Sequence, residues 1–167
     1  MFSMCHYLLD HPTLRTTVKA KDKLAELTDS LQITDVDYQG LVIRLMKEGN
    51  VVAEMILESE DRENLLCIQY FNEDRLIRTE TYTDQIAHTD YYMTAVSERG
   101  LYAKRTRRAY YHKDGSVAFE QVFSEDRCWY LLPDGRILTK AGFIGEFMKA
   151  LDLSEKDIVL IDRFAQL

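Results

Sequence analysis

Hydrophobic and polar residues alternate with a period of two along the middle of the chain, which is typical of β-strands with one buried face. Leu41, Ile43 and Leu45 fall on one side of the first such run, and Arg44 falls on the other. After a turn at Glu48-Gly49-Asn50, the pattern continues at 51–57, 65–71, 75–83, 86–95, 100–111, 116–123, 127–132 and 136–138. Short polar connections join these runs, and two of them contain Asp-Gly, the strongest local signal for a hairpin. The pattern therefore predicts an antiparallel β-meander over residues 40–139.

Two helices are expected at the ends of this sheet. The first would run from an N-cap at Thr17 to about Leu31, with Leu24, Leu27 and Leu31 in its buried stripe. The second would span 141–151, where apolar residues recur at helical spacing. These apolar residues are Phe143, Ile144, Phe147, Met148 and Leu151.

An uninterrupted apolar run, Ile158 to Ile161, follows the second predicted helix. Such a run is typical of a strand buried on both faces of a parallel sheet. We therefore expect a mainly β (α+β) fold in three parts: an N-terminal segment with a short helix (1–39), the antiparallel sheet (40–139), and a helix and strand (140–167). The last part would re-enter a Rossmann-like domain of which only this fragment is present.

Composition narrows the class of protein. Apolar residues make up 46% and charged residues 29%, which are ordinary globular values, and the net charge of −7 argues against a nucleic-acid-binding protein. The three cysteines, Cys5, Cys67 and Cys128, form no CxxC pair and are interpreted as reduced core thiols. The start of the chain lacks a basic segment followed by a long apolar one, and no stretch reaches membrane-spanning length. We expect a cytoplasmic domain, with peripheral membrane association of a larger enzyme left open.

The motifs of common catalytic sites are missing from the sequence. It contains no GxGxxG, GxxxxGK[ST] or GxSxG, and its four histidines lack the HxxxH spacing of a zinc site. Asp35-Val36-Asp37 matches the DxD of metal-dependent sugar transferases, but we interpret it as a solvated loop. The sequence thus predicts no catalytic residue, no metal site and no cofactor site in this chain.

The most concentrated chemical feature is a basic, aromatic strand near residue 105. Strict alternation would place Lys104, Thr106 and Arg108 on one face with Tyr110, and Arg105 and Arg107 on the other. Cations beside aromatic rings can hold phosphate or stack on sugars, although a charged edge strand would look the same. The candidate acceptor-binding or partner-binding residues are Arg99, Lys104, Arg105, Arg107, Arg108, Tyr110 and Tyr111. Trp129, beside Cys128 and Tyr130, is interpreted as a core residue.

Four stretches together resemble a known family. They are the hairpin at 41–58, IQYFNEDRLIRTETY (68–82), RRAYYHKDGSVAFE (107–120) and WYLLPDGRILTKAGFIGEFMKALDLSEKDIVLIDR (129–163). The chain resembles the β-rich insertion domain of bacterial retaining GT-B glycosyltransferases. In particular, it is similar to the glycosyltransferase A subunit of the accessory Sec system and to wall teichoic acid α-glycosyltransferases. In that family, a helix and a strand ending in Asp-Arg, as at Asp162-Arg163, lead back into the Rossmann-like domain.

The resemblance implies a binding role rather than catalysis by this chain alone. Family enzymes hold the nucleotide-sugar donor in a C-terminal domain with an ExxxxxxxE pattern, and no two glutamates here are so spaced. The implied function is acceptor binding and assembly in a retaining hexosyl- or N-acetylhexosaminyltransferase. The expected partners are a Ser/Thr-rich polypeptide or a polyol-phosphate acceptor, and a partner glycosyltransferase subunit or a second copy of the chain. A free-standing interaction domain that pairs through a sheet edge is the alternative.

Overall fold

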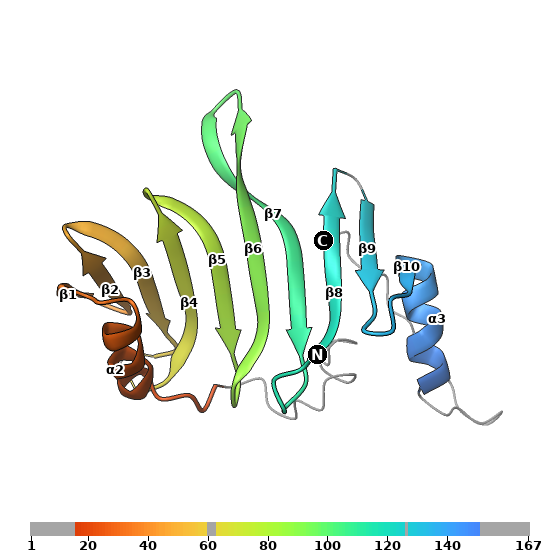
Figure 1. Ribbon diagram of the computed structural model, residues 1–167, viewed down its shortest axis with the longest axis horizontal. Helices are drawn as coiled ribbons and strands as arrows, with labels where there is room; N and C mark the ends of the chain where they lie inside the picture. The colour runs from red at the N-terminus through yellow and green to blue at the C-terminus, as the bar shows by residue number, and fades with distance from the viewer. Residues whose placement is uncertain (1–15, 60–62, 126, 151–167) are drawn as a thin grey trace.

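The computed structural model describes residues 16–59, 63–125 and 127–150, and ten strands in this part form one antiparallel sheet in sequence order (Figure 1). The predicted meander is confirmed. The strands are β1 (Asp35–Gln39), β2 (Val42–Lys47), β3 (Asn50–Leu57), β4 (Leu65–Asn72), β5 (Arg75–Tyr82), β6 (Ile86–Ser97), β7 (Gly100–Tyr111), β8 (Val117–Ser124), β9 (Arg127–Leu131) and β10 (Ile137–Thr139).

Turn residues account for this simple topology. Glu73 and Asp74 both have positive φ, as a two-residue hairpin between β4 and β5 requires. In the two Asp-Gly turns, Gly115 and Gly135 also have positive φ, which glycine adopts without steric cost. The Asp side chain of each turn accepts a hydrogen bond from a backbone N–H two residues on, at 2.9 and 3.0 Å. Tight turns of this kind make each strand pair with the next one.

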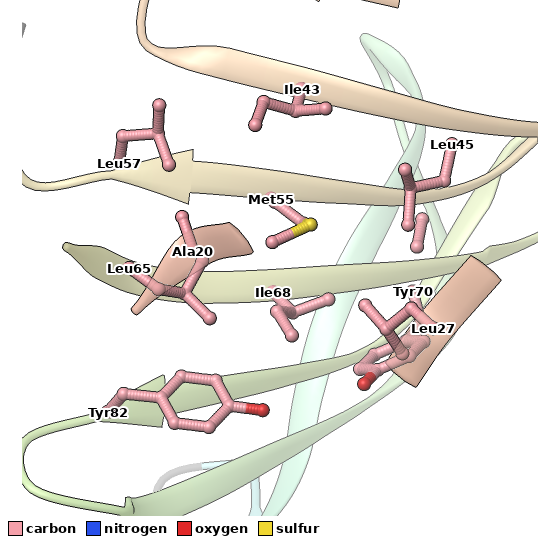
Figure 2. Close-up of a cluster of buried hydrophobic side chains, with 11 residues drawn as sticks. Ala20, Leu27, Ile43, Leu45, Met55, Leu57, Leu65, Ile68, Tyr70 and Tyr82 are labelled. Atoms are coloured by element: carbon pink, nitrogen blue, oxygen red, sulfur yellow. The ribbon is translucent and has the colours of Figure 1, made fainter. Parts of the chain in front are cut away.

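Helix α2 (Ala20–Ser30) covers one face of the sheet over its first strands and forms the main core (Figures 1 and 2). Ala20 and Leu27 reach down from the helix, and the predicted stripe is confirmed because Leu24 and Leu31 pack against the same cluster. From the sheet, Leu45 and Met55 are fully buried beneath the helix. The other sheet residues of this cluster are Ile43, Ala53, Leu57, Leu65, Ile68, Tyr70 and Tyr82.

Helix α3 (Lys140–Ala150) packs on the last strands through a stack of aromatic rings. Phe143 lies 4.2 Å from Tyr130 and 4.7 Å from Phe119, measured between ring centroids. Phe119 in turn stacks on Tyr110 of β7 at 4.5 Å. This second cluster is separate from the core under α2, so the two helices anchor opposite ends of the sheet.

The strand register shows that the two helices lie on opposite faces. Side chains of paired residues point to the same face, and Tyr70 in the α2 core pairs with Arg78, which pairs with Tyr91, which pairs with Arg107. We call this side the α2 face. Tyr110 pairs with Phe119 beneath α3, and we call that side the α3 face. Since α2 covers only the first strands, no helix among the described residues covers the α2 face of the later strands (Figure 1).

The structure corrects two local predictions. The helix begins at Ala20 rather than near Thr17, and its N-cap Lys19 makes no side-chain capping bond. Thr17 is extended because its N–H donates to the Thr83 carbonyl at 2.7 Å, which ties this segment to the end of β5. Asp35 and Asp37 lie in β1 rather than in a loop, because this segment pairs with β2 along its whole length.

Several predictions concern residues that the structure does not describe. Cys5, the run Ile158 to Ile161 and Asp162-Arg163 lie outside the described residues, so the predicted return to a Rossmann-like domain stays a prediction. Within the described part, Cys67 is buried and Cys128 is half-buried. No helix in the described ranges is long and apolar enough to cross a membrane.

Candidate functional site

The predicted site residues on β7 fall on both faces of the sheet, in a different pairing from the one that strict alternation gives. A register shift places Tyr91 opposite Arg107 but Tyr92 opposite Arg105, so Thr106 is an extra residue in a β-bulge. The bulge puts Arg105 on the α3 face with Arg108 and Tyr110. Lys104, Arg107 and Tyr111 take the α2 face, and Arg99 lies in the β6–β7 turn, where its N–H donates to Ser97 Oγ. The predicted faces of Lys104 and Arg105 were wrong because alternation does not continue through a bulge, whereas Arg108 and Tyr110 share a face as predicted.

On the α3 face, two of these cations are held by a carboxylate that the sequence analysis did not single out. Asp90 of β6 is buried and accepts hydrogen bonds from Arg108 Nε at Oδ1 and from a terminal nitrogen of Arg108 at Oδ2, both at 2.7 Å. Arg105 lies 3.5 Å from Oδ1, and His88 Nε2 lies 3.8 Å from Oδ2. Burial lowers the pKa of Arg108, but hydrogen bonds to Asp90 and Tyr110 outweigh it and raise that pKa above its ordinary value.

We call Asp90 and the side chains around it, Arg105, Arg108, Tyr110 and His88, the Asp90 cluster. Within this cluster, Arg105, Arg108 and Tyr110 have structural partners inside the sheet. Tyr110 completes it, since its hydroxyl lies 3.4 Å from Arg108 and 3.2 Å from Gln121. A charged, bidentate pair of this kind fixes the register of β6 on β7. The sequence does carry a signal for this pair. In a hairpin that turns near residues 98–99, residues 88–91 fall opposite residues 107–110, so Asp90 faces Arg108.

On the α2 face, an open concavity of about 670 Å³ lies between the start of α2 and strands β5 to β7. Glu80 is the central acceptor of its floor. The hydroxyls of Tyr70 and Tyr82 both donate to Glu80 Oε2 at 2.8 Å, and Arg78 lies 3.4 Å from Oε1. Burial, followed by the charge of Glu80, raises the pKa of both tyrosines, so they remain neutral donors. The guanidinium of Arg78 also lies 4.0 Å above the ring of Tyr70.

A second group of residues extends the floor of this concavity toward β7. Tyr111 shares hydrogen bonds with Thr89 and Tyr91, and burial raises the pKa of Tyr111. Arg107 stacks over the Tyr91 ring at 4.1 Å and lies 3.6 Å from Glu120. Polar groups held by several partners each are pre-organised, so little ordering remains when a ligand binds.

Beyond the concavity, the end of the β6–β7 hairpin extends past its neighbours (Figure 1). β6 and β7 are twelve residues each, and β5 pairs with β6 only as far as Tyr91. Four large apolar side chains are exposed there: Met93 by 54%, Val96 by 78%, Leu101 by 64% and Tyr102 by 47%. Apolar groups in such numbers on a projecting hairpin indicate a contact surface.

Trp129 also lies on the α2 face, where the register places it opposite Val122. It is half-buried rather than a core residue, while its neighbour Tyr130 on the α3 face is buried under α3. Among residues 16–59, 63–125 and 127–150, no three His, Cys, Asp or Glu side chains gather as metal ligands.

In the described part of the chain, a ten-stranded meander with a helix packed near each end and a projecting hairpin defines an extended β-sheet domain. Residues 35–134 match the family model described as the GtfA extended beta-sheet domain. The match covers more than half of the chain, which therefore belongs to this family.

Relatives and solved structures agree with this assignment. The chain is 25% identical over 160 residues to the GtfA subunit of the UDP-N-acetylglucosamine–peptide N-acetylglucosaminyltransferase of Streptococcus gordonii, with 95% of this chain and 30% of that protein aligned. It superposes on a chain of a GtfA/B complex with a TM-score of 0.75 and 25% identity, over 90% of this chain and 29% of the other. The fold also matches Staphylococcus aureus TarM, with a TM-score of 0.59 at 9% identity, over 90% and 30% of the two chains. The chain thus spans less than a third of the length of these proteins.

Proposed function

We propose that this chain is the acceptor-binding and assembly domain of a bacterial glycosyltransferase. The enzyme would transfer N-acetylglucosamine, or a related hexose, from a nucleotide sugar to a Ser/Thr-rich adhesin or a wall polymer. The observation that carries the proposal is the match of residues 35–134 to a sheet domain that makes up less than a third of its relatives. The remaining two thirds of such an enzyme would bind the donor and perform the chemistry in the cytoplasm, within the accessory Sec system.

The acceptor surface in this proposal is the α2 face of the later strands. Of the predicted site residues, Lys104, Arg107 and Tyr111 lie on this face, beside Tyr91 and Glu120. Three others lie on the α3 face and would stabilise the strands that carry this surface: Arg105 and Arg108 through Asp90, and Tyr110 through Arg108. An extended Ser/Thr-rich segment suits this surface, because hydroxyl and amide groups can exchange hydrogen bonds with tyrosines and paired charges.

The assembly surface in this proposal is the end of the β6–β7 hairpin, with Arg99 in its turn. A solved relative is titled as a GtfA/B complex, which supports a partner glycosyltransferase subunit; a second copy of this chain is the other candidate. Exposed Leu101 and Tyr102 would anchor the partner. Aromatic and aliphatic groups at the centre of an interface supply most of its binding energy.

An NMR titration of the isotope-labelled 167-residue chain would test the acceptor role. The two ligands are an unmodified Ser/Thr-rich peptide and a short polyglycerol phosphate, added in parallel. We expect saturable shifts of Lys104, Arg107 and Tyr111 with one ligand, which would name the acceptor class. Arg107→Gln should weaken that binding, whereas Arg75→Gln, which changes an exposed arginine beside the β4–β5 turn, should not.

The remaining outcomes decide against parts of the proposal. Silence with both ligands would refute the acceptor role. If the chain then formed a complex with another subunit that Leu101→Ser disrupts in size-exclusion chromatography, assembly alone would remain. Strand pairing with an unrelated protein, with no glycosyltransferase bound, would favour the alternative of a free-standing interaction domain.

A further inference from the structure

The concavity on the α2 face has the size of a ligand site and is built from rigid parts. Its volume of about 670 Å³ lies within the usual range for small-molecule sites, about 300–1,000 Å³. Thr17 and Lys23 line the side next to α2, and Glu80, Tyr91 and Tyr111 line the sheet side. The hydrogen bonds of Thr17 to β5 and of Tyr111 to β6 hold both sides in place.

The charges around the concavity argue against an anionic ligand. Its lining residues include three cations and four carboxylates, so the surface has no excess of positive charge. Several of these charges are already paired: Lys23 Nζ donates to Glu26 at 2.7 Å, and Arg78 lies beside Glu80. A phosphate polymer needs unpaired cations, because its affinity comes from charge neutralisation.

The polar groups suit a neutral ligand that carries several hydroxyls. Carboxylate, amide and guanidinium groups are available together, and Gln85 lines the rim with its amide held by the His112 carbonyl at 2.8 Å. The half-buried Tyr91 and Tyr111 add ring surface for the apolar side of a sugar. The Arg78 side chain is 39% exposed, so its terminal N–H groups can donate to an acetamido carbonyl.

We propose that this concavity binds a neutral N-acetylhexosamine that has already been attached to the acceptor. The inference rests on the proposed function and adds the ligand class. Holding a sugar that is already in place keeps the acceptor at the enzyme. The next hydroxyl then meets the active site at a high effective concentration, which favours repeated modification of one chain.

The test uses the labelled 167-residue chain with three probes: methyl α-N-acetylglucosaminide, a peptide carrying one such sugar, and the same peptide unmodified. We expect the glycoside and the modified peptide to give saturable shifts of Gln85, Tyr91 and Tyr111. Thr17→Trp fills the concavity from its exposed rim, and Tyr111→Ser removes part of the floor; each should weaken sugar binding about tenfold. Tyr38→Ser, which alters an exposed tyrosine at the far edge of the sheet, should leave binding within twofold.

Several results would overturn the inference. These are no shifts with either sugar probe, shifts confined to other residues, or unchanged affinity in Thr17→Trp, whose fold is verified from its spectrum. If the unmodified peptide binds the α2 face but the glycoside does not, only the sugar site is refuted. If all three probes are silent, the sugar site and a Ser/Thr-rich acceptor are both refuted, and the titration with polyglycerol phosphate decides whether the acceptor role survives.

Discussion

Removing the charge of Asp90 should destabilise the sheet far more than removing a charge from an exposed ion pair. The Asp90 side chain is 6% exposed and its partner Arg108 is 22% exposed, and two hydrogen bonds of 2.7 Å join them. Asp90→Asn keeps the shape but leaves the guanidinium of Arg108 without a counter-charge. Breaking a buried pair from one side costs about 3–5 kcal/mol. The partial exposure of Arg108 places the expected loss near the lower end, at about 3 kcal/mol.

Urea unfolding followed by tryptophan fluorescence would measure this loss, since Trp129 lies in the sheet. With a slope of about 2 kcal/mol per M, the midpoint should fall by about 1.5 M. The control is Glu63→Gln, whose carboxylate pairs with Lys19 at 3.0 Å with both side chains exposed; it should cost less than about 1 kcal/mol. The double change Asp90→Asn with Arg108→Met should recover stability, because no unpaired buried charge remains. A loss for Asp90→Asn no larger than that of the control would refute the structural role of this cluster.

Three further changes test other parts of the fold. Phe143→Ala should cost about 3 kcal/mol or more and speed amide exchange throughout α3, because it removes the central ring of the stack; the half-buried Ile144→Ala should cost less. Burial raises the pKa of Cys67 to about 11, so site-resolved alkylation of the folded chain at pH 8 should modify Cys128 before Cys67, and equal alkylation of both would contradict this. The stability contributed by the Cys67 thiol should also fall as pH rises from about 9 towards 11, because the unfolded chain loses this proton at a lower pH. Gly115→Ala should lower stability by about 1 kcal/mol in thermal unfolding, because its φ of 82° disfavours any residue with a Cβ, and an unchanged midpoint would count against the assigned turn.

The strands were predictable because local signals agree along this part of the chain. Alternating runs such as 51–57 are separated by residues that accept positive φ, and even the longest hairpin, β6–β7, is complete within 26 residues (86–111). The helix start was not predictable in the same way. Thr17 is a good N-cap by type, but a hydrogen bond to Thr83, sixty-six residues away in sequence (83 − 17), decides its conformation.

The candidate site was predictable as a strand but not as an arrangement of side chains. Both faces of β7 carry cations, so no hydrophobic pattern indicates which residue of 104–108 is the extra one. The bulge at Thr106 settles this question, and it depends on how β6 pairs with β7.

The bulge also explains how one basic strand can have two roles. Without it, Arg105 would leave Asp90 and join Arg107 on the α2 face, and the buried carboxylate would lose a nearby cation. With it, the α3 face takes Arg105 and Arg108 as internal partners. Arg107 remains on the α2 face, stacked on Tyr91 at the edge of the concavity. A change that removes the bulge by giving Thr106 a partner, such as an alanine inserted between Tyr91 and Tyr92, would move Arg105 and Lys104 to the opposite faces of the sheet. Deletion of Thr106, by contrast, would leave Arg105 opposite Tyr92 and Arg107 opposite Tyr91. The insertion should therefore weaken both the sheet and the proposed binding surface, whereas Arg107→Gln should affect binding alone.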